Sequence, residues 1–145
     1  ESGESLLSLL QNRKYKKAEA NILNLNDAPD IAQTICVTAA AMKIPFHLSG
    51  LATLKVKETD RLEALKNELF KIGCRTEITD TEIKSVEFFE PEENISIKTY
   101  HDHRMAMSFA PFALIKTLNI ENPEVVEKSY PQFWEDFETL TETIL

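Results

Sequence analysis

Extended and helical segments alternate along this chain, and polar or charged residues stand at the start of four of the expected helices. These helices begin near Asp30, Thr59, Asp102 and Pro131, as judged from the spacing of their apolar residues. Alternating strands and helices are typical of an α/β fold. The first turn of a helix has free backbone N–H groups and a partial positive charge, so several such ends in one place would bind an anion. The pattern therefore predicts an α/β chain with a site for a small, highly charged anion.

The clearest helix is expected over residues 59–72, where one apolar stripe leads to Gly73, a natural C-terminal stop. The stripe consists of Leu62, Leu65, Leu69 and Ile72. Asp30 is placed to cap a helix over residues 30–42, with Gln33 three residues on. Further helices are expected over residues 4–17, over 102–117 with a break at Pro111, and from Pro131 onward, with a buried face of Phe133, Trp134, Phe137 and Leu140.

Alternating and β-branched residues predict strands between these helices. The predicted strands are residues 22–25, 46–49, 75–79, 83–89 and 95–99, followed by an extended segment over 118–126. The strand–helix order recurs without a repeated sequence, and no low-complexity segment or linker interrupts it. We therefore expect one unit over residues 1–145, and 43% hydrophobic residues are enough to give it a core.

The charge and the cysteine content argue against several classes of protein. A formal net charge of −8 disfavours binding to nucleic acid or to an anionic membrane, because both need a broad basic face. Cys36 and Cys74 lie far apart and form no metal-binding pair or disulfide framework, which fits a reducing cytoplasm. With no segment resembling a membrane span and no visible secretory signal, we expect a cytoplasmic protein.

Two basic clusters are out of keeping with this acidic chain. Lys57, Glu58 and Arg61 surround the start of the helix over residues 59–72. A cation in the first turn of a helix is unfavourable unless it binds something else, such as a phosphate or a carboxylate. The segment 100–105, Tyr-His-Asp-His-Arg-Met, combines an acid, two imidazoles and a guanidinium at another helix start. Because arginine forms a fork with phosphate or carboxylate and histidine can pass a proton, this segment also suits an anionic substrate.

Each cluster also has an ordinary structural interpretation. Residues 57–61 fit a solvated helix start with an exposed ion pair of little energetic consequence. Asp30 and Asp102 fit simple N-caps, and Lys128 fits surface charge. Metal binding by the His-Asp-His-Arg string is disfavoured, because adjacent residues of a helix point in different directions. The coincidence of four polar helix starts favours the functional interpretation.

Four strings in this chain are similar to strings of one enzyme family. They are Pro29-Asp30-Ile31-Ala32-Gln33-Thr34, Val56-Lys57-Glu58-Thr59-Asp60-Arg61-Leu62, Tyr100-His101-Asp102-His103-Arg104-Met105-Ala106-Met107 and Lys128-Ser129-Tyr130-Pro131. They occur in the family's order and at its approximate spacing, over roughly residues 20–141. On these strings the chain resembles the C-terminal part of the 5-enolpyruvylshikimate-3-phosphate synthases (3-phosphoshikimate 1-carboxyvinyltransferases).

The resemblance implies a fold and a reaction. The family's fold has two lobes, each of three strand–helix–strand–helix–strand–strand units, with helix N-termini directed at the cleft between the lobes. This chain would be one incomplete lobe without the other. The family transfers the enolpyruvyl group of phosphoenolpyruvate to the 5-hydroxyl of shikimate 3-phosphate, in the shikimate pathway of aromatic amino-acid biosynthesis. The reaction proceeds by addition and elimination through a tetrahedral intermediate, releases phosphate, and uses no prosthetic group or metal.

The resemblance also implies roles for individual residues. Asp30 would lie near the attacking sugar hydroxyl as a candidate base, Lys57 between the two substrates, and Glu58 at the proton of the enolpyruvyl methylene. Three cations would hold phosphoenolpyruvate, namely Arg61, Arg104 and Lys128. His103 would support the same cluster, and Thr53 would contact the shikimate ring.

Several positions depart from the family's usual pattern. Thr53 and Lys55 stand where the family usually has Asn and Arg, so Thr53 lacks the amide pair and Lys55 lacks the bidentate fork. His101 replaces a residue that is often Asn, and Pro111 is unexpected within its helix. The other lobe's N-terminal Lys, its Ser-Ser-Gln phosphate site and a further Arg have no counterpart in this sequence. We therefore expect a fragment that is inactive alone, with an open sheet edge that favours dimerisation.

Two other functions remain open at this point. One is the related transferase that acts on UDP-N-acetylglucosamine, which shares the fold, although the Lys-Glu-Thr-Asp-Arg and Asp-His-Arg-Met strings are not features of it. The other is a non-catalytic lobe that binds an anion. Thr53 and Lys55 favour this second function slightly, and the intact acids and cations of the two clusters count against it.

Overall fold

The computed structural model describes residues 20–144, and within them strands and helices alternate as expected. The first part contains β1 (Ile22–Asn24), α2 (Ala32–Ala41), β2 (His47–Ser49), α3 (Arg61–Lys71), β3 (Cys74–Ile78) and β4 (Ile83–Phe88). The second part contains β5 (Ile95–Ile97), α4 (His103–Phe109), β6 (Leu118–Ile120) and α5 (Phe133–Ile144). The first part is one complete strand–helix–strand–helix–strand–strand unit, which is the order that the resemblance implies. The helix expected over residues 4–17 lies outside the described residues.

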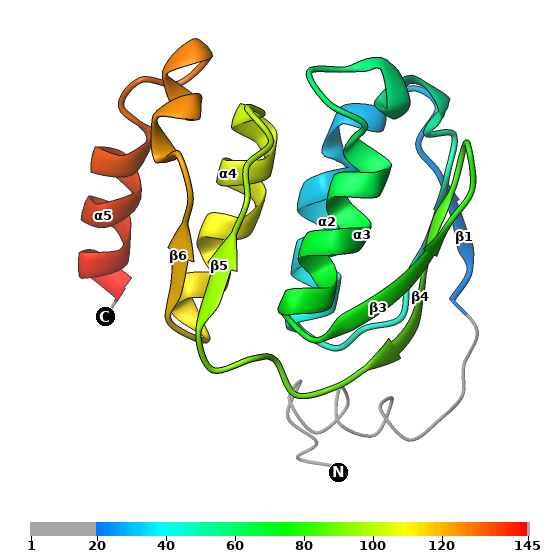
Figure 1. Ribbon diagram of the computed structural model, residues 1–145, viewed down its shortest axis with the longest axis horizontal. Helices are drawn as coiled ribbons and strands as arrows, with labels where there is room; N and C mark the ends of the chain where they lie inside the picture. Colours follow the sequence, from blue (N-terminus) through cyan, green and yellow to red (C-terminus); the bar gives the residue numbers. More distant parts are fainter. Residues whose placement is uncertain (1–19, 145) are drawn as a thin grey trace, which may run out of the picture.

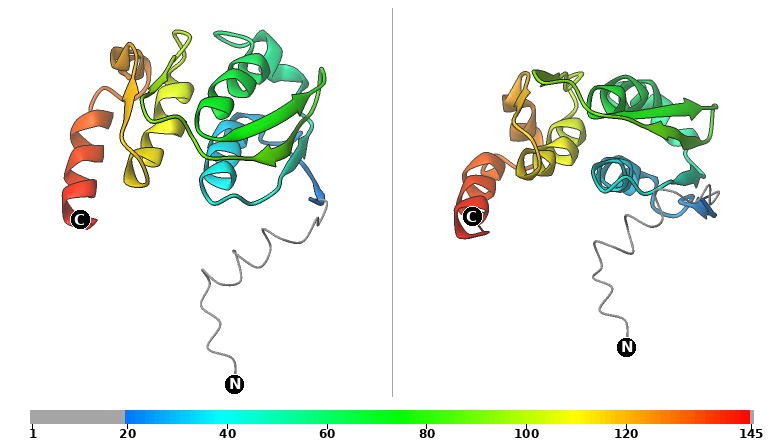
Figure 2. Two further views of the ribbon diagram at one scale, coloured as in Figure 1. Left: turned by 60° about the horizontal axis from the view of Figure 1, so that its bottom comes forward. Right: turned by 90° about the horizontal axis from the view of Figure 1, so that it is seen from below.

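The strands form two separate sheets (Figure 1). The larger sheet has the order β1-β2-β4-β3, with β1 parallel to β2 and with antiparallel pairing of β4 to both β2 and β3. The smaller sheet pairs β5 and β6 in parallel. Helices α2 and α3 lie side by side against one face of the larger sheet, and α4 packs against α2 beside the smaller sheet (Figures 1 and 2). The fold is therefore a mixed α/β arrangement in which α2, α3 and α4 begin at the same end (Figure 1).

Helix α3 carries the apolar stripe that the sequence predicted. Leu62, Leu65 and Leu69 are fully buried, and Ile72 nearly so. The helix ends at Lys71, and the chain turns at Gly73 as predicted. Gly73 has a φ of +93°, and an added Cβ there would lie 2.2 Å from the carbonyl oxygen of Phe89. Burial of this stripe fixes α3, and with it the residues that precede and begin the helix.

The helix predicted over residues 102–117 breaks at the proline, as expected. Helix α4 ends at Phe109, and the short 3₁₀ helix η3 (Ala110–Leu114) follows it. Proline lacks a backbone N–H group and is accepted in the first turn of a new helix. The break confines α4 to seven residues, and the buried side chains of Met105 and Phe109 hold them against the core.

The C-terminal part differs from the prediction in three ways. The extended segment ends at Ile120, and the 3₁₀ helix η4 (Pro123–Lys128) takes up the rest, because Val125 and Val126 turn inward to pack beneath α4. Helix α5 begins at Phe133 rather than at Pro131, which lies in a turn. The buried face predicted for α5 is found only in part, because Phe133 and Trp134 pack against the cluster of Ala106, Val125 and Val126. Phe133, Trp134 and Phe137 are half-buried and Leu140 is 58% exposed, since α5 lies at the edge of the described structure (Figure 1).

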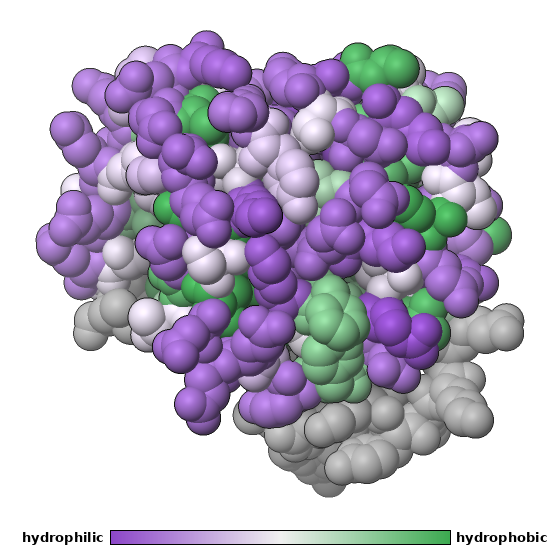
Figure 3. Space-filling model, viewed as in Figure 1, coloured by the Kyte–Doolittle hydropathy of each residue, from purple (hydrophilic) through white to green (hydrophobic). Residues whose placement is uncertain are grey.

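The face of the molecule seen in Figure 3 is mostly hydrophilic, with hydrophobic side chains in small separate patches. Among residues 20–144, no helix combines the length and the apolar character that crossing a membrane would require. The two cysteines are free and buried in the main core. The most notable remaining feature is a cluster of polar side chains at the start of α2, α3 and α4.

Candidate functional site

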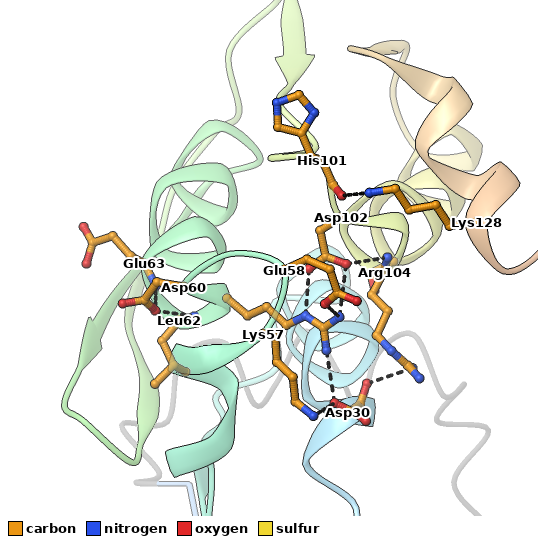
Figure 4. A network of polar contacts seen from close by, with 12 residues as sticks. Asp30, Lys57, Glu58, Asp60, Leu62, Glu63, His101, Asp102, Arg104 and Lys128 are labelled. Atoms are coloured by element: carbon orange, nitrogen blue, oxygen red, sulfur yellow. Dashed lines mark hydrogen bonds and ion pairs between the residues drawn. The ribbon is translucent and has the colours of Figure 1, made fainter.

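Arg61, the first residue of α3, is the centre of this polar cluster. Its side chain is 2% exposed, and its guanidinium donates hydrogen bonds to three carboxylates. Nε and Nη2 donate to Asp102 at 2.7 and 3.2 Å, Nη1 donates to Asp30 at 3.0 Å, and Nη2 also donates to Glu58 at 2.7 Å. The three carboxylates point toward one another in Figure 4. A buried guanidinium needs such partners, because an unpaired buried charge is strongly unfavourable.

The three carboxylates reach Arg61 from different helix starts. Asp30 lies in the 3₁₀ helix η1 (Pro29–Ile31) before α2, and Glu58 lies in the loop between the 3₁₀ helix η2 (Ala52–Val56) and α3. Asp102 is the N-cap of α4 and accepts a hydrogen bond from the backbone N of Arg104 at 2.9 Å. The predicted convergence of helix starts is therefore confirmed for α2, α3 and α4.

Two more cations contact Asp30, and a third, Lys128, binds the turn before Asp102 (Figure 4). Lys57 Nζ lies 3.7 Å from Asp30 Oδ1, and Arg104 Nη1 donates to the backbone carbonyl oxygen of Asp30 at 3.3 Å. Lys128 Nζ donates to the carbonyl oxygen of His101 at 3.0 Å. Lys128 comes from the end of η4 and not from the start of α5, so within residues 20–144 no fourth helix N-terminus joins the cluster.

The charges of this cluster determine what it can bind. Its three carboxylates are outnumbered by four cations, which are Lys57, Arg61, Arg104 and Lys128. Arg61 has five N–H donors, and four hydrogen bonds to carboxylates occupy it. A ligand therefore reaches this guanidinium through one remaining N–H, or by displacing Asp30 or Glu58. Both of these carboxylates are 39% exposed and can move, whereas Asp102 is fully buried.

The prediction that Asp30 caps α2 is wrong. The N-cap position of α2 is Ile31, where no side chain accepts a hydrogen bond, and the Asp30 carboxylate turns to Arg61 instead. A hydrogen bond between two charged groups is stronger than a cap to a neutral N–H, which explains this choice. Gln33 does not complete a capping box, since its side chain is buried without a hydrogen-bond partner among residues 20–144. Asp60 does cap α3, through the backbone N atoms of Leu62 and Glu63.

Several residues singled out in the sequence do not join the bonded cluster. Thr53 is exposed in η2, and its side chain makes no hydrogen bond within the described part of the chain. Lys55 bonds to Asp80 at 2.6 Å, which raises the pKa of Lys55 and lowers that of Asp80. His103 is half-buried, and its Nδ1 has no partner among residues 20–144. The roles of Thr53 and His103 stay predictions.

A further contact that the sequence did not predict joins α3 to the segment between β5 and α4. It lies between Glu68 and Tyr100. Glu68 is 1% exposed on α3 and accepts a hydrogen bond from the Tyr100 hydroxyl at 2.8 Å. Burial and this hydrogen bond raise the pKa of Tyr100 to about 12. The available signal was the spacing of Arg61 and Glu68, which are seven positions apart and therefore lie on the same face of the helix as the apolar stripe. Within the described residues, no group of three or more acidic, His or Cys side chains is placed to hold a metal ion.

The chain is similar to known proteins over most of its length. The family model described as EPSP synthase (3-phosphoshikimate 1-carboxyvinyltransferase) matches residues 5–137. A 3-phosphoshikimate 1-carboxyvinyltransferase of Bacteroides fragilis is 49% identical over 113 residues, which are 76% of this chain and 28% of that protein. The protein of the same name from Syntrophobacter fumaroxidans is 40% identical over 121 residues, 81% of this chain and 28% of that protein.

A solved structure agrees with these relatives. The structure of EPSP synthase from Acinetobacter baumannii superposes with a TM-score of 0.63 at 27% sequence identity, and covers 81% of this chain and 29% of that chain. The chain thus spans less than a third of the length of the relatives that it matches. The four strings, which contain Asp30, Arg61, Arg104 and Lys128, fall within the matched residues.

Proposed function

The chain belongs to the EPSP synthase family, and we propose that it supplies part of the active site of a 3-phosphoshikimate 1-carboxyvinyltransferase. In this proposal, the complete polypeptide transfers the enolpyruvyl group of phosphoenolpyruvate to the 5-hydroxyl of shikimate 3-phosphate and releases phosphate. The other lobe of the family's fold supplies the rest of the site, so the chain is inactive alone.

One observation carries this proposal. Arg61 binds three carboxylates, of which Asp30 and Asp102 lie 31 and 41 positions away in the sequence and Glu58 only three. Further cations lie beside them, among them Lys57 next to Asp30. Both substrates are anions, with a phosphate on each and a carboxylate on each. A site that binds them needs several cations in one place, together with acids that exchange protons during the reaction.

The addition step needs a base and an acid. We assign the base to Asp30, which takes the proton of the 5-hydroxyl as its oxygen attacks C2 of phosphoenolpyruvate. We assign the acid to Glu58, which delivers a proton to the methylene C3, so that a tetrahedral intermediate with a methyl group forms. Arg104 and Lys128 hold the anionic groups of phosphoenolpyruvate, and Lys57 lies between the substrates. The side chains of Asp30 and Glu58 are each 39% exposed, so solvent and substrate can reach both carboxylates.

The elimination step reverses the proton movement at the methyl group. Glu58 takes back a proton from C3, the C2=C3 double bond re-forms, and the bond from C2 to the phosphate oxygen breaks. Phosphate then leaves with the bonding electrons. Glu58 is paired with Arg61 Nη2 at 2.7 Å, so the substrate must displace this contact or share the guanidinium with it. His103 and Thr53 complete the proposed site as a supporting residue and a contact to the shikimate ring.

The test is phosphate release by the complete polypeptide with shikimate 3-phosphate and phosphoenolpyruvate. Glu58→Gln should lower kcat by about 10²–10⁴-fold, the usual contribution of a general acid or base. Arg104→Ala should lower kcat/KM for phosphoenolpyruvate. The matched controls are Glu63→Gln and Arg75→Ala, which change an exposed acid and an exposed cation away from the cluster and should leave the rate unchanged.

The outcomes separate this function from its two alternatives. Turnover by the wild type that is lost in both site variants and kept in both controls supports the proposal. Turnover with UDP-N-acetylglucosamine in place of shikimate 3-phosphate would instead indicate the related transferase. Binding of phosphoenolpyruvate without turnover would indicate a lobe that only binds an anion, and turnover by residues 1–145 alone would refute the proposed need for the other lobe.

A further inference from the structure

The turn between β5 and α4 has an unfavourable backbone conformation. Tyr100 and His101 are consecutive residues with φ values of +54° and +58°, although neither is a glycine. Left-handed conformations are disfavoured for residues with a Cβ, and such strain persists only where the surroundings hold it. The next residue is Asp102, which caps α4 and pairs with the buried Arg61. The strained turn therefore leads directly into the polar cluster.

A buried carboxylate holds this turn from the side of α3. Glu68 Oε1 accepts the hydrogen bond from the Tyr100 hydroxyl at 2.8 Å, and Oε2 accepts one from the backbone N of Lys98 at 3.1 Å. Glu68 Oε2 also lies 2.7 Å from Lys71 Nζ, which neutralises the buried charge. The two oxygens thus bind the chain before the turn and a side chain within it.

The far side of the same turn contacts Lys128. The carbonyl oxygen of His101 accepts the hydrogen bond from Lys128, and the N of Asp102 donates to the carbonyl oxygen of Thr99 at 2.8 Å. A left-handed residue at position 101 orients this carbonyl group toward Lys128, while the His101 side chain is exposed and points away (Figure 4). A relaxed turn would move this carbonyl group and the start of α4 together.

Helix α3 therefore fixes the β5–α4 connection at two points. Arg61 binds Asp102 after the turn, and Glu68 binds Lys98 and Tyr100 before and within it. The two anchors are seven residues apart, which is two turns of the helix, so both face the same side.

We propose that Glu68 is a positioning residue for this site, because it holds the Tyr100–His101 turn in the conformation that places Asp102, Arg104 and Lys128 around the substrate. Glu68 does not touch the substrate and acts only through the turn. The inference rests on the proposed function for its kinetic consequence, but its structural consequence can be tested without turnover.

The first experiment measures amide hydrogen exchange in the complete polypeptide. Glu68→Ala removes both acceptor oxygens, and exchange at the amides of Asp102 and Arg104 should accelerate by about tenfold or more, because hydrogen bonds to a charged group are lost. Amides of the β3–β4 hairpin should accelerate much less. Glu68→Gln keeps one acceptor oxygen and a polar partner for Tyr100, so it should restore most of the protection. Glu63→Gln, an exposed acid on the same helix, is the matched control and should have no effect.

The second experiment measures substrate dependence of phosphate release in the same variants. Glu68→Ala should raise KM for phosphoenolpyruvate by a larger factor than KM for shikimate 3-phosphate, because Arg104 and Lys128 belong to the phosphoenolpyruvate side of the proposed site. Glu68→Gln should lie close to the wild type. A merely structural role would lower the amount of active protein without separating the two KM values.

Two results would overturn the inference. One is an equal acceleration of exchange in the turn and in the β3–β4 hairpin, or no acceleration in the turn. The other is an equal change of both KM values when the wild type is active. If the wild type releases no phosphate, the proposed function fails, and the exchange measurement alone decides whether Glu68 holds the turn.

Discussion

The pair of Arg61 and Asp102 leads to a quantitative prediction, because Asp102 has two roles that one substitution can separate. Its carboxylate caps α4 through the backbone N of Arg104, and it also binds the guanidinium of Arg61 at 2.7 and 3.2 Å. Asparagine caps helices about as well as aspartate. Asp102→Asn should therefore keep the cap and remove the charge that compensates Arg61.

The expected magnitude follows from the burial of the two partners. Asp102 is fully buried and Arg61 is 2% exposed, and removal of one partner from a buried ion pair costs about 3–5 kcal/mol. Arg61 keeps the half-exposed Asp30 and Glu58 as partners, so the lower end applies. We expect Asp102→Asn to lower the free energy of unfolding by about 3 kcal/mol.

The control is the same substitution at the N-cap of α3. Asp60 accepts hydrogen bonds from the backbone N atoms of Leu62 and Glu63, and the described structure gives it no ion pair. Asp60→Asn should cost about 0.3–1 kcal/mol, the usual interaction of a negative charge with a helix N-terminus. Asp102→Asn loses this interaction as well, so the difference between the two variants isolates the pair with Arg61.

Urea unfolding followed by circular dichroism measures both values. With a denaturant slope of about 1.5 kcal/mol per M, the expected loss shifts the midpoint for Asp102→Asn by about 2 M. Equal effects of Asp102→Asn and Asp60→Asn would refute the reasoning, since Asp102 would then act as a cap and not as the partner of a buried charge. A further loss of about 1 kcal/mol is expected in Asp102→Ala, where the cap disappears too.

Two further predictions concern backbone conformation and pH. Gly73→Ala should lower the free energy of unfolding in urea by more than about 1 kcal/mol, because position 73 has a φ of +93° and the new Cβ would lie 2.2 Å from the carbonyl oxygen of Phe89; a loss below about 0.5 kcal/mol would contradict this clash. Tyr100 should ionise near pH 12 in the folded protein, against about 10 in the unfolded chain. The folded state holds this proton more tightly, so the stabilisation is complete below about pH 10 and is lost as the pH rises toward 12. The difference in absorbance at 295 nm between the wild type and Tyr100→Phe measures this ionisation, and a midpoint near 10 would count against burial of the Tyr100–Glu68 contact.

Local sequence patterns were sufficient for most of the first unit. The stripe of α3 and the stop at Gly73 depend on residues that are near neighbours in the sequence, and the structure agrees with both. The break at Pro111 has a similarly local cause. The C-terminal part was harder, because Val125 and Val126 have the β-branched side chains of a strand but pack beneath α4 as part of η4. Their packing against Ala106 therefore outweighed the preference of valine for a strand.

The sequence indicated which segments contribute charged residues to the cluster, but it did not indicate how these residues pair. The strings around Lys57 and Arg104 identified which segments carry the charges, but local spacing contains no information on which acid meets which cation. Asp30 illustrates this, since its position before α2 suited a cap and the structure pairs it with Arg61, 31 residues away. The prediction of a substrate-facing Arg61 also took no account of burial, which turns most of its donors toward carboxylates of the chain itself.

The buried position of Arg61 is relevant to the proposed anion site, because this site lies in an acidic chain. A cluster of exposed cations without substrate would repel itself, and a buried guanidinium without partners would be unstable. Asp102 provides a permanent partner that burial prevents from leaving, whereas Asp30 and Glu58 are partners that the solvent can reach. In the proposed function, an anionic substrate would replace the two exposed carboxylates at the guanidinium while the buried one keeps α3 and α4 together. The two carboxylates released in this way are those assigned to proton transfer, so binding of the substrate would free the groups that the reaction requires.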